Sequence, residues 1–200
     1  SNNIAIFQDS MDLIKANQKL QQAVQFSIQN QKLYVPSQAI ALSEPGKSSC
    51  KTIVSSKRSF EAASAYAKSG KRVCVLNFAS ATNPGGGVTR GSTAQEECLC
   101  RCSTLYPCLD TETMWHQFYQ PHRKTSDPLY NDDLLYTPGV VIFKTDTSVP
   151  ERMEEKDWYQ VDIITCAAPN LRKKPSNAMN PSAGNAPVKI SEKALYELQM

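Results

Sequence analysis

The fold of this chain is decided by the stretch Asn77-Phe-Ala-Ser-Ala-Thr-Asn-Pro-Gly85-Gly86-Gly87-Val-Thr-Arg-Gly-Ser-Thr-Ala-Gln95-Glu96-Glu97. It begins in an apolar strand, passes through three consecutive glycines and re-forms as a helix with two adjacent carboxylates in its first turn. Three glycines in a row lose much backbone entropy on ordering, which indicates unusual φ angles or a backbone that a ligand approaches closely. A strand, a glycine turn and a helix N-terminus in this order are typical of a site that binds an anion.

The spacing around the glycines separates this stretch from known nucleotide-binding loops. It contains no Gly-x-Gly-x-x-Gly, and no Lys-Ser/Thr pair follows the glycines as a P-loop requires. A kinase-like or dehydrogenase-like interpretation therefore has little support. Thr93 and Glu96 have the spacing of a capping box, which predicts that they satisfy each other's amide groups at the helix start.

The pattern Gly-Gly-Gly, seven residues, Gln-Glu-Glu resembles the signature of poly(ADP-ribose) glycohydrolases. The flanking Leu-Asn-Phe-Ala-Ser-Ala-Thr-Asn-Pro and Glu97-Cys-Leu-Cys-Arg-Cys-Ser-Thr-Leu-Tyr-Pro resemble the shorter, microbial-type branch of that family. Weaker matches follow at residues 129–130, 136–138 and 163–170. The resemblance runs from about residue 50 to residue 170 and is most specific over residues 76–107.

We expect an α/β fold, because predicted strands and helices alternate along the chain. The resemblance implies a macrodomain-like three-layer α/β/α arrangement with a mixed central sheet. The expected organisation is one domain over residues 1–200, with a helical extension at 1–35, a core at 50–170, and a loop and final helix at 171–200. The chain looks truncated, because the helix predicted over Ile190–Met200 has no terminator and the family continues into a second glycine-rich loop.

Local patterns predict the individual elements. The first thirty residues carry a helical stripe of apolar side chains, and Asn170–Ala186 reads as a functional loop or disorder. The other expected elements are a short strand at Thr52–Val54, a helix from Ser59 to Gly70, a strand at Val73–Phe78 with both faces covered, a helix at Ala94–Leu105 stopped by Pro107, and strands at Gly139–Phe143 and Val161–Cys166.

Composition is that of an ordinary globular domain, with 200 residues, 40% hydrophobic content and a net charge of +3. No apolar run reaches the ~18 residues that a membrane helix needs, and the mild charge implies no specific nucleic-acid partner. The seven cysteines include the alternating Cys98, Cys100 and Cys102, whose spacing does not suit a metal site. We expect a cytoplasmic protein with reduced, mostly buried thiols.

The resemblance implies hydrolysis of ribose–ribose O-glycosidic bonds in poly(ADP-ribose), without a metal or a cofactor. Glu97 would be the general acid and base, and Glu96 would hold the ribose hydroxyls. ADP-ribose and its polymer are the expected ligands, and ADP-ribosylated proteins are further partners that the family allows. The expected substrate-binding residues are Ser80, Asn83, Gly85, Gly86, Gly87 and Gln95.

Several alternatives stay open from the sequence. The two glutamates are also ordinary capping residues, and Glu97 has the (i, i+4) spacing of an ion pair with Arg101. Asn83 could merely shape its turn. A binding module for ADP-ribose without turnover is the second functional interpretation, because no counterpart of the second glycine loop is found. We expect His116 and His122 at the surface, and core packing rather than adenine stacking for the aromatic residues between 115 and 136.

Overall fold

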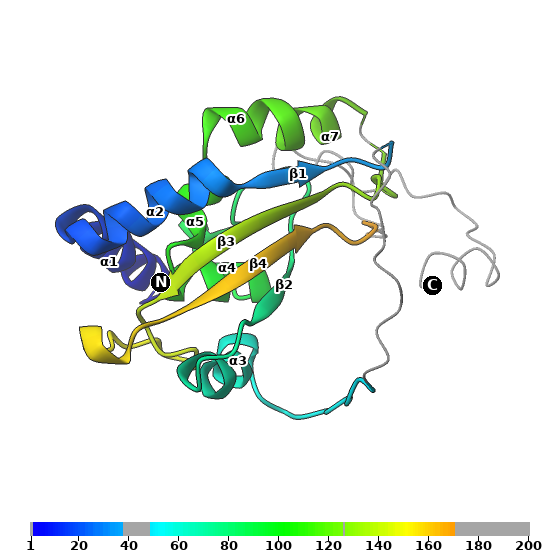
Figure 1. Cartoon of the computed structure of the whole chain (residues 1–200). Coiled ribbons are helices and arrows are strands. Elements are labelled where there is room, and N and C mark those ends of the chain that lie inside the picture. Colours follow the sequence, from blue (N-terminus) through cyan, green and yellow to red (C-terminus); the bar gives the residue numbers. More distant parts are fainter. Residues whose placement is uncertain (1, 38–48, 126, 171–200) are drawn as a thin grey trace.

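The structure is a computed structural model that describes residues 2–37, 49–125 and 127–170 (Figure 1). The strands within these ranges are β1 (Lys32–Tyr34), β2 (Cys74–Phe78), β3 (Leu134–Ile142) and β4 (Tyr159–Cys166). The helices are α1 (Asn2–Ala16), α2 (Gln18–Asn30), α3 (Ser59–Lys68), α4 (Gln95–Cys102), α5 (Leu105–Leu109), α6 (Glu112–Met114) and α7 (Gln120–Thr125). A π-helical turn over Trp115–Tyr119 joins α6 to α7, and short 3₁₀ turns cover Val88–Arg90 and Glu155–Asp157.

The strands form one mixed sheet in the order β1-β3-β4-β2. β3 pairs antiparallel with β1 and β4, whereas β2 pairs parallel with β4. The predicted α/β fold with a mixed sheet is therefore confirmed. Because β2 and β4 are parallel, their carboxyl ends meet at one edge, and the amide of Ala79 donates to the carbonyl of Cys166 at 3.0 Å. This edge is where an open α/β sheet usually binds a ligand.

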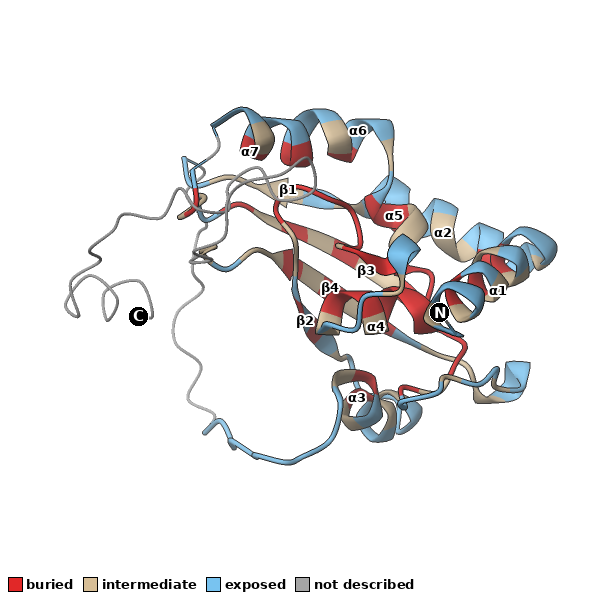
Figure 2. Ribbon diagram, turned by 180° about the vertical axis from the view of Figure 1, so that it is seen from behind, coloured by how far each residue is buried: buried red, intermediate tan, exposed pale blue. Residues whose placement is uncertain are grey.

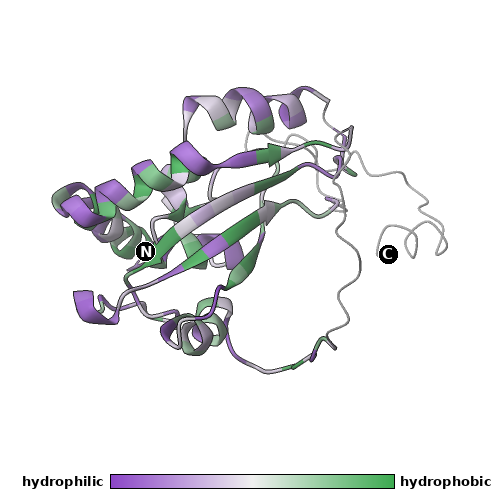
Figure 3. Cartoon of the chain, in the orientation of Figure 1, coloured by the Kyte–Doolittle hydropathy of each residue, from purple (hydrophilic) through white to green (hydrophobic). Residues whose placement is uncertain are grey.

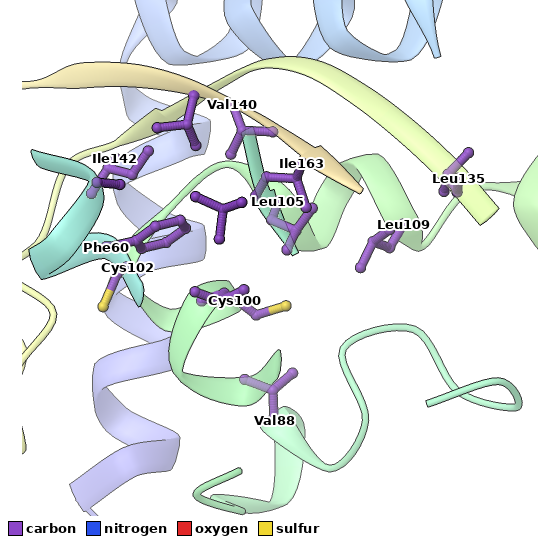
Figure 4. Packing of buried hydrophobic residues seen from close by; sticks show 14 of the residues in the cluster. Phe60, Val88, Cys100, Cys102, Leu105, Leu109, Leu135, Val140, Ile142 and Ile163 are labelled. Carbon is purple, nitrogen blue, oxygen red and sulfur yellow. The ribbon is translucent and has the colours of Figure 1, made fainter. Parts of the chain in front are cut away.

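The main core lies between the sheet and the helices α4 and α5 (Figure 2). Figure 4 shows Cys100 and Leu105 from these helices beside Ile142 and Ile163 from the strands, with Phe60 of α3 closing one side. The apolar side chains of the strands pack against those of α4 and α5, whereas α7 is hydrophilic along its whole length (Figure 3). Burial of this surface is the dominant favourable contribution to folding.

The predicted N-terminal helical extension is present as the two helices α1 and α2, and α1 also contributes to the core. Phe7 is 7% exposed and belongs to the main cluster. The hydroxyl of Ser10 donates to the carbonyl of Arg101 at 2.7 Å, and buried Lys144 donates to the carbonyl of Ile6 at 2.8 Å. Lys144 also pairs with Asp9 at 2.7 Å, so that α1 is tied to both α4 and the end of β3.

The interpretation of residues 73–78 as a strand with both faces covered is wrong for the described part of the chain. β2 is an edge strand with alternating burial, and Leu76 and Phe78 are 45% and 62% exposed. Val75 and Asn77 face the core instead. A run of apolar residues does not by itself distinguish a central strand from an edge strand.

Three other local predictions need correction. Residues 52–54 form an exposed loop and not a strand, with Val54 92% exposed. The helix predicted over Ala94–Leu105 ends at Cys102, and Pro107 lies inside the next helix, α5. Proline fits there because the first turn of a helix needs no amide donor. The stretch 108–138, for which no helix was predicted, contains the end of α5 together with α6 and α7.

The helix α3 begins and ends where predicted, with Gly70 after it at a φ of +79°. Its start is stabilised from a distance, because the carboxylate of Asp146 accepts from the amide of Phe60 at 3.0 Å. The predicted loop at 170–186 and helix at 190–200 lie outside the described residues, apart from Asn170. Within the described ranges, every helix is too short or too polar to cross a bilayer.

Candidate active site

A cavity of about 310 Å³ opens at the carboxyl end of β2. Its walls come from the segment after β2, the glycine loop, the start of α4, the loop before β3 and the segment after β4. The lining residues are Phe78, Ala79, Ser80, Ala81, Asn83, Gly86, Gly87, Arg90, Ser92, Ala94, Glu96, Glu97, Tyr130, Ala168, Pro169 and Asn170.

The glycine loop lies directly against the two carboxyl groups of α4. Gly86 has a φ of +58°, and a Cβ there would lie 2.6 Å from Glu97 Oε1 and 3.3 Å from Glu96 Oε2. A Cβ on Gly87 would lie 2.3 Å from Ser92 Oγ. The absence of side chains therefore lets the backbone approach the carboxyl groups, and both glutamates reach the same cavity although they are consecutive on a helix.

Glu96 is 2% exposed, and both of its carboxyl oxygens accept hydrogen bonds. The amide of Ser80 donates to its Oε2 at 2.7 Å, and Asn77 Nδ2 donates to its Oε1 at 3.3 Å. Burial is the main cause that raises the pKa of Glu96 to about 8; Ser80 and Asn77 oppose this rise, and the neighbouring charge of Glu97 adds to it. Burial therefore favours the protonated form of Glu96.

The predicted capping box is wrong. The N-cap residue of α4 is Ala94, which makes no side-chain cap bond, and Glu96 reaches across to the segment after β2 instead of back to Thr93. A carboxylate in the first turn of a helix can accept a hydrogen bond either from the amides of that turn or from amides of distant segments. The chain folds so that the distant donor of Ser80 lies within reach, and local sequence does not encode that distance.

Glu97 is 7% exposed and has one fixed oxygen and one that is unpaired within the described residues. The amide of Gly87 donates to its Oε1 at 2.9 Å, while the buried Oε2 has no hydrogen-bond partner there. Arg101 does not take this oxygen, because its guanidinium donates to the carbonyl of Ser92 at 2.7 Å and to Cys98 Sγ at 3.3 Å. Unpaired buried oxygens are uncommon in proteins and are frequent at functional sites.

Ser80 and Asn83 both line the cavity and also shape the turn between β2 and the glycines. Ser80 Oγ accepts from the amide of Asn83 at 3.1 Å. Arg123 of α7 donates to Asn83 Oδ1 and, through Nε at 2.7 Å, to the carbonyl of Thr82. Arg123 thus holds the turn from a distance of forty residues, and no local pattern in the sequence indicates this role.

The structure does not bring Gln95 and Gly85 into the cavity with the other predicted site residues. Gln95 bonds the exposed edge of β2, accepting from the amide of Phe78 at 2.8 Å and donating to the carbonyl of Leu76 at 2.7 Å. Its carboxamide takes the place that a neighbouring strand's backbone would occupy. Gly85, at a φ of +63°, packs against the ring of Tyr106, where a Cβ would lie 2.7 Å from Cδ2.

The aromatic and histidine predictions are confirmed in part. His116 is exposed at 64%, as expected, but His122 is 4% exposed and its placement at the surface is wrong. It packs edge-on against Phe118 with 4.6 Å between ring centroids. Phe118 and Tyr119 are core residues, whereas Tyr130 lines the cavity. Arg90 and Ser92 also line it and were not predicted; their only sequence signal is that they lie between the glycines and the glutamates.

All seven cysteines are free, and three of them, Cys100, Cys102 and Cys108, are buried. Burial raises the pKa of Cys102 to about 12, which disfavours its thiolate. The expectation of mostly buried thiols is thus wrong for Cys50 and Cys74, which are exposed. In the part of the chain that is described, no group of three or more histidine, cysteine or acidic side chains is arranged to hold a metal ion.

Comparison with known proteins shows which family carries this glycine loop beside two adjacent glutamates. The family model described as "Microbial-type PARG, catalytic domain" matches residues 5–145. The chain belongs to this family. PARG stands for poly(ADP-ribose) glycohydrolase, and the matched residues include the glycine loop and both glutamates.

Solved PARG structures resemble the chain in fold and sequence. PARG from Thermomonospora curvata has a TM-score of 0.71 and 30% identity, covering 84% of this chain and 64% of that one. The same protein bound to the inhibitor ADP-HPD has a TM-score of 0.65 and 30% identity, covering 84% and 63%. PARG from Deinococcus radiodurans in complex with ADP-ribose has a TM-score of 0.60 and 32% identity, covering 73% and 58%.

The chain spans less than two thirds of the length of these PARG structures. No curated protein matches it significantly. Membership of the PARG family and the macrodomain-like α/β fold follow from the comparisons, and the mixed sheet of four strands agrees with both.

Proposed function

We propose that this chain hydrolyses the ribose–ribose O-glycosidic bonds of poly(ADP-ribose) and releases ADP-ribose, with Glu97 as the general acid and base. The observation that carries this proposal is the buried Oε2 of Glu97 at the cavity, which has no hydrogen-bond partner among the residues that the structure describes. The adjacent Oε1 is fixed by Gly87, so that the carboxyl group is oriented before a ligand arrives. Membership of the PARG family supports the reaction class.

The chemistry needs one carboxyl group to act twice. Glu97 in its acid form gives a proton to the oxygen of the departing ribose while the bond from that oxygen to the anomeric carbon breaks. The resulting carboxylate then takes a proton from a water molecule as the water oxygen bonds the oxocarbenium-like carbon. A sugar bound over the cavity would exclude water from the site, and loss of water favours the protonated form of a carboxyl group.

The other lining residues position the sugar in this proposal. Glu96, fixed by Ser80 and Asn77, would hold ribose hydroxyls, and its proton makes it a donor as well as an acceptor. The backbone of Gly86 and Gly87, which lines the cavity beside the two carboxyl groups, would lie against the ribose and its phosphate. Asn83 and Ser80 would contribute the remaining polar contacts, because both line the cavity.

The test compares the chain with its Glu97→Gln variant for release of ADP-ribose from poly(ADP-ribose). Loss of a general acid and base lowers turnover by about 10² to 10⁴-fold, and ADP-ribose binding measured by calorimetry should persist. Glu112→Gln is the matched control, because that carboxylate is 92% exposed on α6. Equal turnover in Glu97→Gln and the parent would refute the assignment. Binding without release by the parent would favour the ADP-ribose-binding module instead.

A further inference from the structure

Tyr130 has an unusual backbone conformation at the edge of the cavity. Its φ of +56° makes it the only non-glycine residue with a positive φ among the residues that the structure describes. A bulky L-residue rarely adopts this left-handed conformation, because its Cβ meets the following carbonyl oxygen. Such strain persists only where surrounding contacts hold it, and it is concentrated at ligand sites.

Contacts on both sides hold the loop that carries Tyr130. The amide of Asn170 donates to the carbonyl of Pro128 at 2.6 Å, which ties the loop to the segment after β4. On the other side, buried His122 bonds Asn131 Oδ1 through Nε2 at 2.9 Å. The same imidazole meets the Tyr130 ring edge-on, with 5.7 Å between centroids. The loop is therefore fixed by α7 and by the end of the sheet.

Tyr130 is one of the residues that line the cavity, together with Glu96 and Glu97. Its burial is intermediate, unlike that of Phe118 and Tyr119 in the adjacent helical segment, which are fully buried core residues. A core role does not explain a strained, half-buried tyrosine. A cavity of about 310 Å³ lies at the lower end of the range for a single small-molecule site, so a ligand unit held by the two glutamates would lie close to Tyr130.

We propose that Tyr130 contacts the ADP-ribosyl unit bound in this cavity, and that His122 is a positioning residue that acts through Tyr130. This inference rests on the proposed function and adds a contact residue to it. Aromatic rings give ligands a large, rigid contact surface with little loss of side-chain entropy, which suits a wall of a sugar- or base-binding site. His122 supports the wall from behind, where it packs between Phe118 and Tyr130.

The decisive variant is Tyr130→Asn, because asparagine tolerates the left-handed conformation but lacks the ring. Its melting temperature should equal or exceed that of the parent, while its affinity for ADP-ribose in calorimetry should fall about tenfold, as for loss of one aromatic contact with a ligand. Tyr130→Phe should bind like the parent. Tyr66→Ala is the control, because Tyr66 is 44% exposed on α3 and does not line the cavity.

Parent-like affinity of Tyr130→Asn for ADP-ribose would refute the proposal that Tyr130 contacts the ligand. A fall in melting temperature that accompanies the loss of affinity would also overturn it, because the tyrosine would then be structural. If the unsubstituted chain does not bind ADP-ribose, the proposed function fails and this inference fails with it. Binding by the unsubstituted chain with no effect of Tyr130→Asn refutes only the inference.

The positioning role of His122 has a separate readout. His122→Phe keeps a ring beside Tyr130 but removes the bond to Asn131 and the contact with buried Asp133, so it should weaken ADP-ribose binding in the parent background. In the Tyr130→Asn background the same change should have no further effect, because residues that act through one contact are not additive. An equal loss in both backgrounds would show that His122 does not act through Tyr130.

Discussion

Replacing Gly86 by alanine adds one methyl group at the point where the glycine loop meets the carboxyl groups. The new Cβ would lie 2.6 Å from Glu97 Oε1, 3.2 Å from Glu97 Cδ and 3.3 Å from Glu96 Oε2. Ordinary contacts of this kind begin at 3.4 Å, so the Glu97 carboxyl group must move by about 0.8 Å. The substitution therefore displaces the proposed acid and base without changing its chemistry.

Two effects of this substitution have separate magnitudes. The φ of +58° costs a non-glycine residue about 1 kcal/mol of stability, which lowers the melting temperature by roughly 2 to 4 °C in a chain of this size. Displacing a catalytic group by about 1 Å lowers turnover by about 10²-fold, which corresponds to roughly 2.7 kcal/mol in the barrier. The substitution should therefore raise the reaction barrier by more than it lowers the free energy of unfolding.

Gly70→Ala is the matched control for Gly86→Ala. Gly70 has a φ of +79°, but nothing lies within 4 Å of the position that its Cβ would take. It should lose a similar amount of stability and retain parent-like turnover. The assay is release of ADP-ribose from poly(ADP-ribose) by both variants, with melting temperatures measured in parallel. The same turnover in the two variants would refute the inference that the loop positions Glu97.

Three further predictions concern stability. Because burial raises the pKa of Glu96 to about 8, the folded chain keeps a proton that the unfolded chain releases, so the free energy of unfolding should fall as pH rises from about 5 to 8. In Glu96→Gln the free energy of unfolding, measured by urea denaturation at each pH, should depend less on pH. The same pH dependence in this variant and the parent would contradict the prediction. Lys144→Met removes the contacts of Lys144 with Ile6 and Asp9 of α1, so it should lower the free energy of unfolding by about 2 kcal/mol and speed amide hydrogen exchange in α1. Parent-like exchange in α1 would show that Lys144 does not hold this helix in place. Gln95→Ala removes two hydrogen bonds to β2 and should lower the free energy of unfolding by roughly 1 to 2 kcal/mol in urea denaturation without changing ADP-ribose affinity. Weaker ADP-ribose binding with unchanged stability would instead support the expectation that Gln95 contacts the ligand.

Local sequence was sufficient for the features that depend on local physics. The positive φ angles at Gly85 and Gly86 need glycine, and the three glycines before Glu96 and Glu97 indicate a loop that lies against a helix N-terminus. Alternation of strands and helices was sufficient for the α/β class. Helical periodicity also predicted helical structure in the first thirty residues, where α1 and α2 lie.

Tertiary structure decided which partner each polar group takes. Glu96 bonds Ser80 and Asn77 instead of Thr93, and Gln95 bonds the edge of β2 instead of facing the cavity. These choices depend on the parallel pairing of β2 with β4, which places the end of β2 beside α4. Sequence periodicity reports only which face of an element is apolar.

The same limit explains the residues that were misplaced or missed. His122 was expected at the surface, yet its ring is buried between Phe118 and Tyr130. Arg123 holds a turn some forty residues away, and Tyr130 reaches the cavity through a strained loop. The sequence by itself determined the chemical groups of the site and the loop that exposes them; only the packing of distant segments decided their distances, because contacts between residues far apart in the chain leave no local pattern.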